Sequence, residues 1–360
     1  MFARARPTEE LPAPARPARV ALIVALTLLS FAVVNFAIGR ALRHYTTNLG
    51  YYLIAYKWRL LLEQDEPASW LILGDSTCNQ GVDPDVFDRS LRVSSLNLCT
   101  NASMQVLNDA WMLQEHVDRF GPPEGVVVIH THDAWATNLG GGGGSIRRGP
   151  LAAGMAQIPL PWGFWERTAP GLDLSAEDER LVFLGRYAPV YAQNRTLRTW
   201  ARNPTGAAAR VRRRRFEANG FMPREASPGR ARGDAGNHLK YVKRHRFRVA
   251  PWSRKALTAM EDLAKRHRFP LYIAHSPIVS TLEKQPAFRR YAHGMSEELE
   301  RLTRGNEYVH YLDYWVTFPT KDMDQADHVS WKAAVKFTQE LARSIQRTRP
   351  SEAKGRGRSK

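Results

Sequence analysis

Residues 70–76, with the sequence WLILGDS, decide the fold of this chain. The four apolar residues predict a short buried strand, and Gly74 and Asp75 are residue types that turn a chain sharply. Ser76 follows the turn, so its hydroxyl is expected at the end of a strand, where α/β enzymes display a serine nucleophile. Taken alone, the tripeptide is weak evidence, because a serine after such a turn is usually a turn or helix N-cap residue.

A second signal lies near the end of the chain, where residues 324–328 read DQADH. This cluster can meet Ser76 only if a parallel sheet brings distant strand ends together. Apolar runs predict such strands, separated by helices, at 93–98, 125–130, 271–274 and 309–312. The expected class is therefore α/β, with a doubly wound parallel sheet of flavodoxin-like type.

The composition permits a large folded domain and favours anionic partners. The chain has 360 residues, of which 43% are hydrophobic, enough for one large domain or two small ones. Its 52 Lys and Arg against 35 Asp and Glu give a net charge of +17. Such an excess suits nucleic acid, anionic lipid or an acidic polymer, although a solvated Arg-rich surface gives the same count. With only Cys78 and Cys99, the chain is neither a disulfide-rich scaffold nor a cysteine-based zinc module.

The N-terminal region predicts a membrane anchor. Residues 1–19 are rich in Pro, Ala and Arg and are expected to be disordered, whereas residues 20–38 carry no charge. An uncharged stretch of this length nearly matches the hydrocarbon core, so it predicts one transmembrane helix. The rivals fit less well: a cleaved signal peptide usually has a shorter apolar region, and a buried soluble helix has a polar face.

The flanking residues predict topology and domain limits. Basic residues stand on both sides of the span with a slight excess before it, which favours a cytoplasmic N-terminus and an extracytoplasmic domain. Residues 39–66 predict a helical stalk whose aromatic side chains, including Trp58, lie near the membrane surface. The globular domain is expected at 67–345, followed by a disordered basic tail at 346–360.

The domain contains an Arg-rich insertion at about 145–250, for which no regular structure is predicted. The five glycines at 140–144 predict a flexible loop, because a phosphate-binding loop needs a preceding strand, a following helix and usually a lysine. We expect residues 195–235 to be exposed and to present a positive surface beside the site for an acidic polymer or lipid headgroups. A membrane anchor and a hydrolase-like core speak against nucleic acid as a partner.

The loops after the strands carry the residues of chemical interest, and in an open parallel sheet they share its carboxyl edge. They are residues 74–76, 97–102, 130–133 and 324–328. Their order resembles that of the SGNH (GDSL-type) hydrolase superfamily, over roughly 67–138 and 250–345 but not over the insertion. The resemblance implies that Ser76 is the nucleophile and that His328 activates it.

The resemblance also implies donors for the oxyanion that forms during attack. The family's second-block glycine falls at Ala102, which keeps a backbone N–H to donate beside that of Ser76. The third-block asparagine falls at His132, whose imidazole N–H can replace the amide donor. We therefore expect His132 to point toward Ser76; the alternative is that it only fills the loop.

The acid that would orient His328 is the main departure from the family pattern. The position three residues before the histidine holds Gln325, which cannot act as an acid. Asp324 and Asp327 flank it, and either can orient the imidazole. If neither does, the site is degenerate.

With its anchor and its closing helix at 332–345, the chain looks closest to membrane-anchored SGNH-like proteins of polysaccharide and teichoic acid O-acylation. This resemblance implies a serine esterase or O-acyltransferase acting on acyl esters of cell-envelope or exopolysaccharide glycans, with a multi-pass membrane O-acyltransferase as partner. The alternative is a catalytically degenerate binding or scaffold subunit that holds an acidic polymer. No cofactor or metal is expected, because His130, His132 and Asp133 lack further well-placed ligands. His275 is expected to be structural.

The two cysteines give a separate expectation. An extracytoplasmic domain exposes them to an oxidising compartment. Cys78 lies two residues after Ser76, and Cys99 directly follows the next predicted strand, so the fold can bring them together. We expect their Cα atoms to lie within disulfide range, about 4.4–6.8 Å. In a cytoplasmic chain they would be buried thiols.

Overall fold

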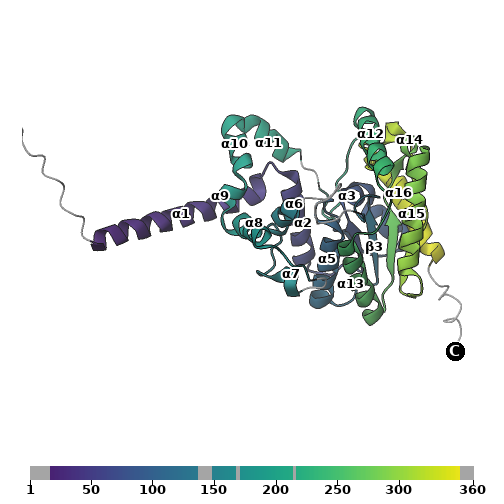
Figure 1. Cartoon of the computed structure of the whole chain (residues 1–360), viewed down its shortest axis with the longest axis horizontal. Helices are drawn as coiled ribbons and strands as arrows, with labels where there is room; N and C mark the ends of the chain where they lie inside the picture. Colours follow the sequence, from purple (N-terminus) through teal and green to yellow (C-terminus); the bar gives the residue numbers. More distant parts are fainter. Residues whose placement is uncertain (1–16, 137–147, 168–170, 214–215, 349–360) are drawn as a thin grey trace, which may run out of the picture.

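The computed structural model describes residues 17–136, 148–167, 171–213 and 216–348. Over these ranges the chain forms an α/β domain around a parallel sheet, with one long apolar helix projecting from its N-terminal end (Figure 1). Disorder was expected at 1–19 and 346–360, of which residues 1–16 and 349–360 lie outside the described residues, as does the expected flexible loop at 140–144. The prediction is wrong for the remaining residues, because 17–19 belong to the helix Pro17–Tyr45 and 346–348 to the helix Trp331–Thr348.

The central sheet has five parallel strands in the order β2-β1-β3-β4-β6. These strands are β1 (Trp70–Gly74), β2 (Ser95–Asn97), β3 (Gly125–His130), β4 (Leu271–His275) and β6 (Val309–Leu312). A separate parallel pair consists of β5 (Ile278–Val279) and β7 (Thr317–Phe318). Every residue of β1, β3 and β4 is buried, which explains their nearly continuous apolar sequences. The prediction of an α/β fold with a parallel sheet is confirmed.

Helices connect these strands and cover the sheet (Figure 1). Outside the insertion they are α1 (Pro17–Tyr45), α2 (Leu49–Leu62), α3 (Ser76–Gly81), α4 (Pro84–Leu91), α5 (Gln105–Phe120), α13 (Pro251–His267), α14 (Ser280–Glu283), α15 (Pro286–Thr303) and α16 (Trp331–Thr348), with a 3-10 turn at Thr320–Asp322. α5 packs against α13, while α3 and α4 pack against α16. In α16 the completely buried Phe337, Leu341 and Ile345 recur every four residues, which is the apolar stripe of an amphipathic helix.

The strand order creates a switch point at β1, which lies between β2 and β3. Connections that leave a sheet in opposite directions open a crevice at the carboxyl ends of the adjacent strands. The loop after β1 begins at Asp75, and the loop after β3 begins at Thr131. The sheet therefore brings the candidate residues at 74–76 and at 130–133 to the same place.

Gly74 permits the close approach of these two strand ends. Its φ of +144° is a conformation that L residues with a side chain rarely adopt, and a Cβ atom there would lie 1.9 Å from the Ile129 carbonyl oxygen. The next backbone N–H, that of Asp75, donates to the same oxygen at 3.3 Å. A larger residue at position 74 would force β3 away from Ser76.

Residues 39–66 are mostly helical, as predicted, but the prediction that they form a stalk outside the domain is wrong, because α2 packs into the domain core. α1 continues to Tyr45, and α2 then packs against α5. Trp58 does not lie at a membrane surface: it is completely buried, and its Nε1 donates to Asn108 Oδ1 at 3.0 Å. Lys57 is also buried, and its Nζ donates to the Gly220 carbonyl at 2.6 Å. Burial holds the pKa of Lys57 well below its ordinary value.

The prediction that the insertion is irregular is also wrong. It folds into α6 (Arg148–Met155), α7 (Phe164–Arg167), α8 (Ala176–Tyr187), α9 (Pro189–Ala192), α10 (Asn194–Arg202), α11 (Pro204–Arg212) and α12 (Pro228–Arg244). Leu151, Met155 and Val182 join the main hydrophobic core, so the insertion is part of the domain. Arginine and alanine, which dominate it, are strong helix formers even where no clear apolar stripe marks a helix.

Cys78 and Cys99 form a disulfide, and their Cα atoms lie 5.8 Å apart. The expected proximity is confirmed. The bond joins α3, which begins at Ser76, to the segment after β2. It therefore fixes the candidate residues at 74–76 and at 97–102 relative to each other.

Candidate active site

Ser76 is the first residue of α3 and is held by the residue before it. Asp75 caps the helix, because its Oδ1 accepts hydrogen bonds from the backbone N–H of Thr77 at 2.9 Å and from the Thr77 hydroxyl at 2.7 Å. Its Oδ2 accepts from the backbone N–H of Thr131 at 2.9 Å. Asp75 thus joins the end of β1 to the loop after β3. Because Ser76 is the next residue, these contacts also fix its position.

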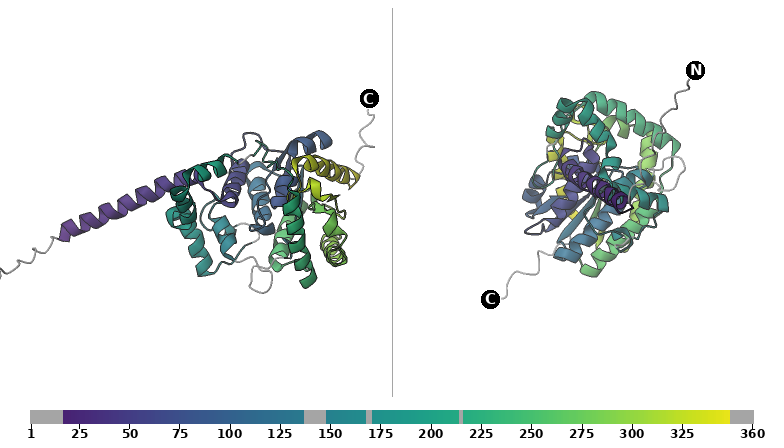
Figure 2. Two further views of the ribbon diagram at one scale, coloured as in Figure 1. Left: turned by 90° about the horizontal axis from the view of Figure 1, so that it is seen from above. Right: turned by 90° about the vertical axis from the view of Figure 1, so that its left-hand side faces the viewer.

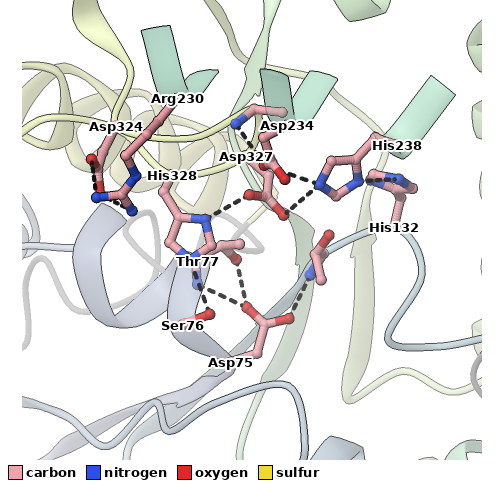
Figure 3. Close-up of polar contacts among 12 residues, drawn as sticks. Asp75, Ser76, Thr77, His132, Arg230, Asp234, His238, Asp324, Asp327 and His328 are labelled. Atoms are coloured by element: carbon pink, nitrogen blue, oxygen red, sulfur yellow. Dashed lines mark hydrogen bonds and ion pairs between the residues drawn. The ribbon is translucent and has the colours of Figure 1, made fainter. Parts of the chain in front are cut away.

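Ser76, His328 and Asp327 form a hydrogen-bonded chain (Figure 3). Ser76 Oγ lies 2.9 Å from His328 Nε2, and His328 Nδ1 lies 2.6 Å from Asp327 Oδ1. The imidazole therefore uses one nitrogen for the hydroxyl and the other for the carboxylate. This is the geometry in which a histidine removes a proton from a serine while an acid fixes its tautomer.

The closing loop is folded so that two consecutive side chains face the same site. Residues Met323 and Val329 form an antiparallel bridge. Within the loop, the His328 carbonyl oxygen accepts from the backbone N–H groups of Asp324 at 2.8 Å and Gln325 at 3.2 Å. Asp327 and His328 are only 4% and 7% exposed, so both turn inward together.

The two acids that the sequence left open therefore have different positions. Asp327 contacts the imidazole of His328. Asp324 instead forms an ion pair with Arg230, in which Nη1 and Oδ1 are 3.4 Å apart. Gln325 is an amide and supplies only its backbone N–H to the loop. Asp327 is thus the acid that can orient His328. Asp324 is near His328 in the sequence, but its carboxylate pairs with Arg230.

Neighbouring charges shift the pKa values of both Asp327 and His328. Burial alone would raise the pKa of the Asp327 carboxyl, but the positive charges of His328 and His238 hold it below its ordinary range. Burial alone would lower the pKa of His328, but the Asp327 carboxylate raises it above its ordinary value. Asp327 is therefore ionised at neutral pH and stabilises an imidazolium at His328.

Sequence reasoning missed three residues of α12, which the insertion brings to the site. Arg230, Asp234 and His238 recur every four residues and lie on one face of the helix. Arg230 pairs with Asp324, and Asp234 Oδ2 accepts from the backbone N–H of Ala326 at 3.0 Å. Through these contacts α12 holds the closing loop. The recurrence of polar residues every four positions is the sequence signal that could have identified them.

His238 forms an ion pair with Asp327 on the side away from His328 (Figure 3). Its Nε2 lies 3.3 Å from Asp234 Oδ2 and 3.7 Å from Asp327 Oδ2, while its Nδ1 lies 3.1 Å from His132 Nε2. Burial alone would lower the pKa of His238, but the charge of Asp327 and the bond to Asp234 raise it to about 9. His238 is therefore an imidazolium that donates from both nitrogens.

The expectation that His132 points toward Ser76 is wrong. The His132 imidazole faces His238, and Figure 3 places it on the far side of His238 from Ser76. Burial and the positive charge of His238 lower the pKa of His132 to about 4. Since His238 donates to it, His132 Nε2 is an acceptor and cannot donate to an oxyanion.

The other two expected oxyanion donors are backbone groups. The N–H of Ser76 lies in the first turn of α3, where helix geometry supplies no acceptor for it. Ala102 lies in the turn after β2, a segment joined to β1 by the bond from the Thr100 N–H to the Gly74 carbonyl at 2.8 Å. Their role as donors stays a prediction.

A buried ion pair lies beneath the site. His130 contacts Asp109 through Nε2, and its Nδ1 lies 3.4 Å from Asp75 Oδ2. Burial alone would lower the pKa of His130, but the two carboxylates raise it to about 10. Net, the contacts to His130, Thr131 and Thr77 hold the pKa of Asp75 below its ordinary range despite burial. His130, charged at neutral pH, thus supports Asp75, the residue that caps α3.

One cluster near the site could hold a metal ion by its chemistry. Ligand atoms of Asp234, His238 and Asp327 lie within 4.8 Å of one another, and carboxylate with imidazole suits a zinc-type ion. His238 Nε2 approaches both carboxylates as an N–H donor, so a metal ion would have to displace that proton. A proton network explains these contacts without a further ligand. The expected structural His275 lies at the end of β4, and its Nε2 contacts the Tyr311 hydroxyl.

Comparison with known proteins does not assign the chain to a family. No protein-family model matches it, and no curated protein matches it. The chemical interpretation of the site therefore depends on its geometry.

Proposed function

We propose that the chain is a serine esterase or O-acyltransferase of the SGNH type, acting on acyl esters of cell-envelope or exopolysaccharide glycans. The observation that carries this proposal is the chain from Ser76 Oγ through the His328 imidazole to the Asp327 carboxylate, with contacts of 2.9 Å and 2.6 Å. A structural serine has no need of a buried imidazole and carboxylate in series. The position at the switch point of a parallel sheet supports the same reading.

The geometry supports a two-step acyl transfer. Ser76 Oγ attacks the carbonyl carbon of the ester while His328 Nε2 removes the hydroxyl proton, and Asp327 stabilises the imidazolium. The backbone N–H groups of Ser76 and Ala102 would receive the oxyanion. His328 then gives its proton to the leaving alcohol, which leaves an acyl-serine. Water or a glycan hydroxyl then attacks the carbonyl carbon of that ester while His328 removes its proton. The acyl group leaves on the attacking oxygen, and His328 returns the proton to Ser76 Oγ.

A groove beside the closing loop supports a polymeric substrate. Its volume is about 1420 Å³, and Gln80, Asp324, Gln325 and the exposed Trp331 contribute to its wall. In total, five arginines and four acidic residues line it, so its charge is mixed with a slight positive excess: Arg89, Arg212, Arg213, Arg224, Arg230, Asp83, Glu217, Glu225 and Asp324. Such a wall suits a hydroxyl-rich chain with scattered negative charge, and exposed tryptophan offers a flat face for a sugar ring.

Two observations support an extracytoplasmic site on a single-pass protein. The candidate membrane span of α1 is Pro17–Leu42, and none of its most apolar window is buried, so the helix is long and apolar enough to cross a membrane. The disulfide between Cys78 and Cys99 suits an oxidising compartment. A multi-pass membrane O-acyltransferase that delivers the acyl group remains part of the proposal through the resemblance alone.

Hydrolysis of p-nitrophenyl acetate by the full chain in detergent tests the proposal. We expect burst kinetics with wild type and loss of turnover in Ser76→Ala, because the acyl-serine cannot form. Ser90→Ala is the matched control, since the Ser90 hydroxyl donates to the Val86 carbonyl of its own helix at 2.7 Å. Equal turnover in wild type and Ser76→Ala would contradict the proposal and favour the alternative of a non-catalytic scaffold subunit.

A further inference from the structure

The apolar helix α1 is fastened to the insertion where it enters the domain. Asn35 Oδ1 accepts from the Val190 backbone N–H at 3.4 Å, and Asn35 Nδ2 donates to the Tyr187 carbonyl. A Cβ atom at Gly39 would lie 2.7 Å from Pro189 Cγ, so a glycine is needed for this close contact. Asn35 and Gly39 belong to the apolar segment that ends at Leu42. The end of α8 and all of α9 are therefore held at the depth where α1 would leave a bilayer.

Helices α8, α9 and α10 form the end of the domain from which α1 projects (Figures 1 and 2). Aromatic side chains are exposed on this end: Phe183 and Tyr187 of α8 are 51% and 53% exposed, and Tyr191 of α9 is 62% exposed. The rings of Phe183 and Tyr187 are in contact, with centroids 5.0 Å apart. Exposed aromatic rings beside a membrane helix match the headgroup level, where such rings are favoured.

α10 presents basic side chains at the same end. Arg195, Arg198 and Arg202 recur at spacings of three and four residues, so they share one helix face, and all three are exposed. They line a shallow hollow of about 390 Å³. Another part of α10 is fixed to the end of α1, since Trp200 Nε1 donates to the Tyr45 carbonyl at 2.8 Å. The arginine face therefore has a defined direction relative to the anchor.

We propose that this surface binds the anionic headgroups of the bilayer that α1 enters. We call it the membrane-proximal face: Phe183, Tyr187, Tyr191, Arg195, Arg198 and Arg202. Aromatic rings at the interface and guanidinium groups opposite lipid phosphates are complementary to a headgroup layer, and the contacts of α1 place the face at that layer. A soluble acidic polymer would satisfy the arginines but would leave the aromatic rings exposed to water.

This binding would fix the orientation of the domain, because a second attachment to the membrane prevents the rotation that a single helix allows. It goes beyond the proposed chemistry at Ser76, which lies in a different part of the domain. The two can therefore fail separately, and a Ser76→Ala chain is as suitable for the experiment as wild type.

The experiment uses the full chain in lipid nanodiscs with a fluorophore on one introduced cysteine. The native cysteines are joined in the disulfide, so Arg198→Cys provides a single reactive thiol, and Arg290→Cys on α15 is the control at an exposed position far from α1. Quenching by headgroup-nitroxide lipid is measured in phosphatidylcholine discs with and without phosphatidylglycerol. We expect strong quenching at position 198 that increases with phosphatidylglycerol and decreases with salt, and no quenching at position 290.

The variant R195E/R202E tests the charge requirement in the Arg198→Cys background. We expect it to lose the phosphatidylglycerol-dependent quenching, because the two guanidinium groups beside the label are replaced by carboxylates. Quenching at position 198 no stronger than at position 290 would overturn the proposal. So would quenching that is unchanged by phosphatidylglycerol, by salt and by R195E/R202E, since contact without charge dependence is not headgroup recognition.

Discussion

Asp327 Oδ1 lies 2.6 Å from Nδ1 of His328, the next residue in the chain. Adjacent side chains in an extended segment point in opposite directions, so this contact requires a tight loop. The His328 carbonyl provides it by accepting two backbone N–H bonds from within the same loop. In the proposed mechanism, this acid beside the histidine takes the role that the SGNH pattern gives to an acid three residues earlier.

Asp327→Asn should reduce the rate constant for acyl transfer by about 10⁴-fold at neutral pH, because the amide no longer fixes the imidazole tautomer or stabilises the imidazolium. Asp324→Asn is the matched control, since Asp324 pairs with Arg230 rather than with His328. We expect it to retain activity within about tenfold. Steady-state ester hydrolysis measures both. A larger loss in Asp324→Asn than in Asp327→Asn would show that the wrong acid has been assigned.

The pH dependence of kcat/KM should report His328 and its neighbours. His328 acts as a base only when neutral, and Asp327 raises its pKa above the ordinary 6.5, so activity should rise with pH through an apparent pKa above that value. His238→Gln removes a positive charge next to Asp327. Asp327 then stabilises the His328 imidazolium more strongly, so the apparent pKa should move upward and activity at neutral pH should fall.

This shift separates a positioning role of His238 from a purely structural one. A loss of fold would lower kcat at every pH without moving the apparent pKa. His132→Ala is the comparison, because His132 only accepts a bond from His238 and should keep turnover within about tenfold. An unchanged pH profile in His238→Gln would count against the extended network.

The buried His130 should make stability depend on pH. Its pKa is raised in the folded chain from 6.5 to about 10, so its contribution is fully present below pH 6.5 and is lost as the pH rises through about 10. His130→Gln should lower the free energy of unfolding by about 3–5 kcal/mol near pH 6, because it leaves Asp109 and Asp75 without their cation. Urea unfolding in detergent between pH 6 and about 10 measures this. A wild-type stability that does not decline over this range would refute the assignment.

The disulfide should stabilise the folded domain. Its cysteines are 21 residues apart, and closing a loop of that size typically contributes about 2–4 kcal/mol. C78S/C99S should lower the free energy of unfolding by that amount, as measured by urea unfolding. A thiol reagent should label no cysteine in the native chain before reduction. Two readily labelled thiols in the unreduced chain would contradict the pairing.

The sheet was the most predictable part of the molecule. The strands at 125–130 and 309–312 have the predicted limits, because continuous apolar runs bounded by polar residues define buried parallel strands. The strand predicted at 93–98 is shorter, Ser95–Asn97. Its ends are instead fixed by tertiary bonds, such as that from the Asn97 N–H to the Asn219 carbonyl at 2.9 Å, which no local pattern contains.

The candidate site was predictable where one residue type must do the chemistry, and unpredictable where partners come from the insertion. Ser76 and His328 can be paired from the sequence because both follow predicted strands whose carboxyl ends share one edge of a parallel sheet. The choice between Asp324 and Asp327 depended on a loop bend that sequence spacing does not show. His132 was misjudged because its partner, His238, lies on a helix that an Arg-rich sequence concealed.

Labelling with a fluorophosphonate tests the proposed nucleophile most directly, because the reagent forms a covalent bond only with a serine that a neighbouring base activates. We expect one adduct on the peptide that contains Ser76, formed in wild type and absent from Ser76→Ala and His328→Ala. Ser330, a buried serine close to the same loop, serves as the internal control and should remain unmodified. A wild-type chain that stays unmodified at Ser76 under conditions that label a known serine esterase would contradict the assignment of Ser76 and His328 as a catalytic pair.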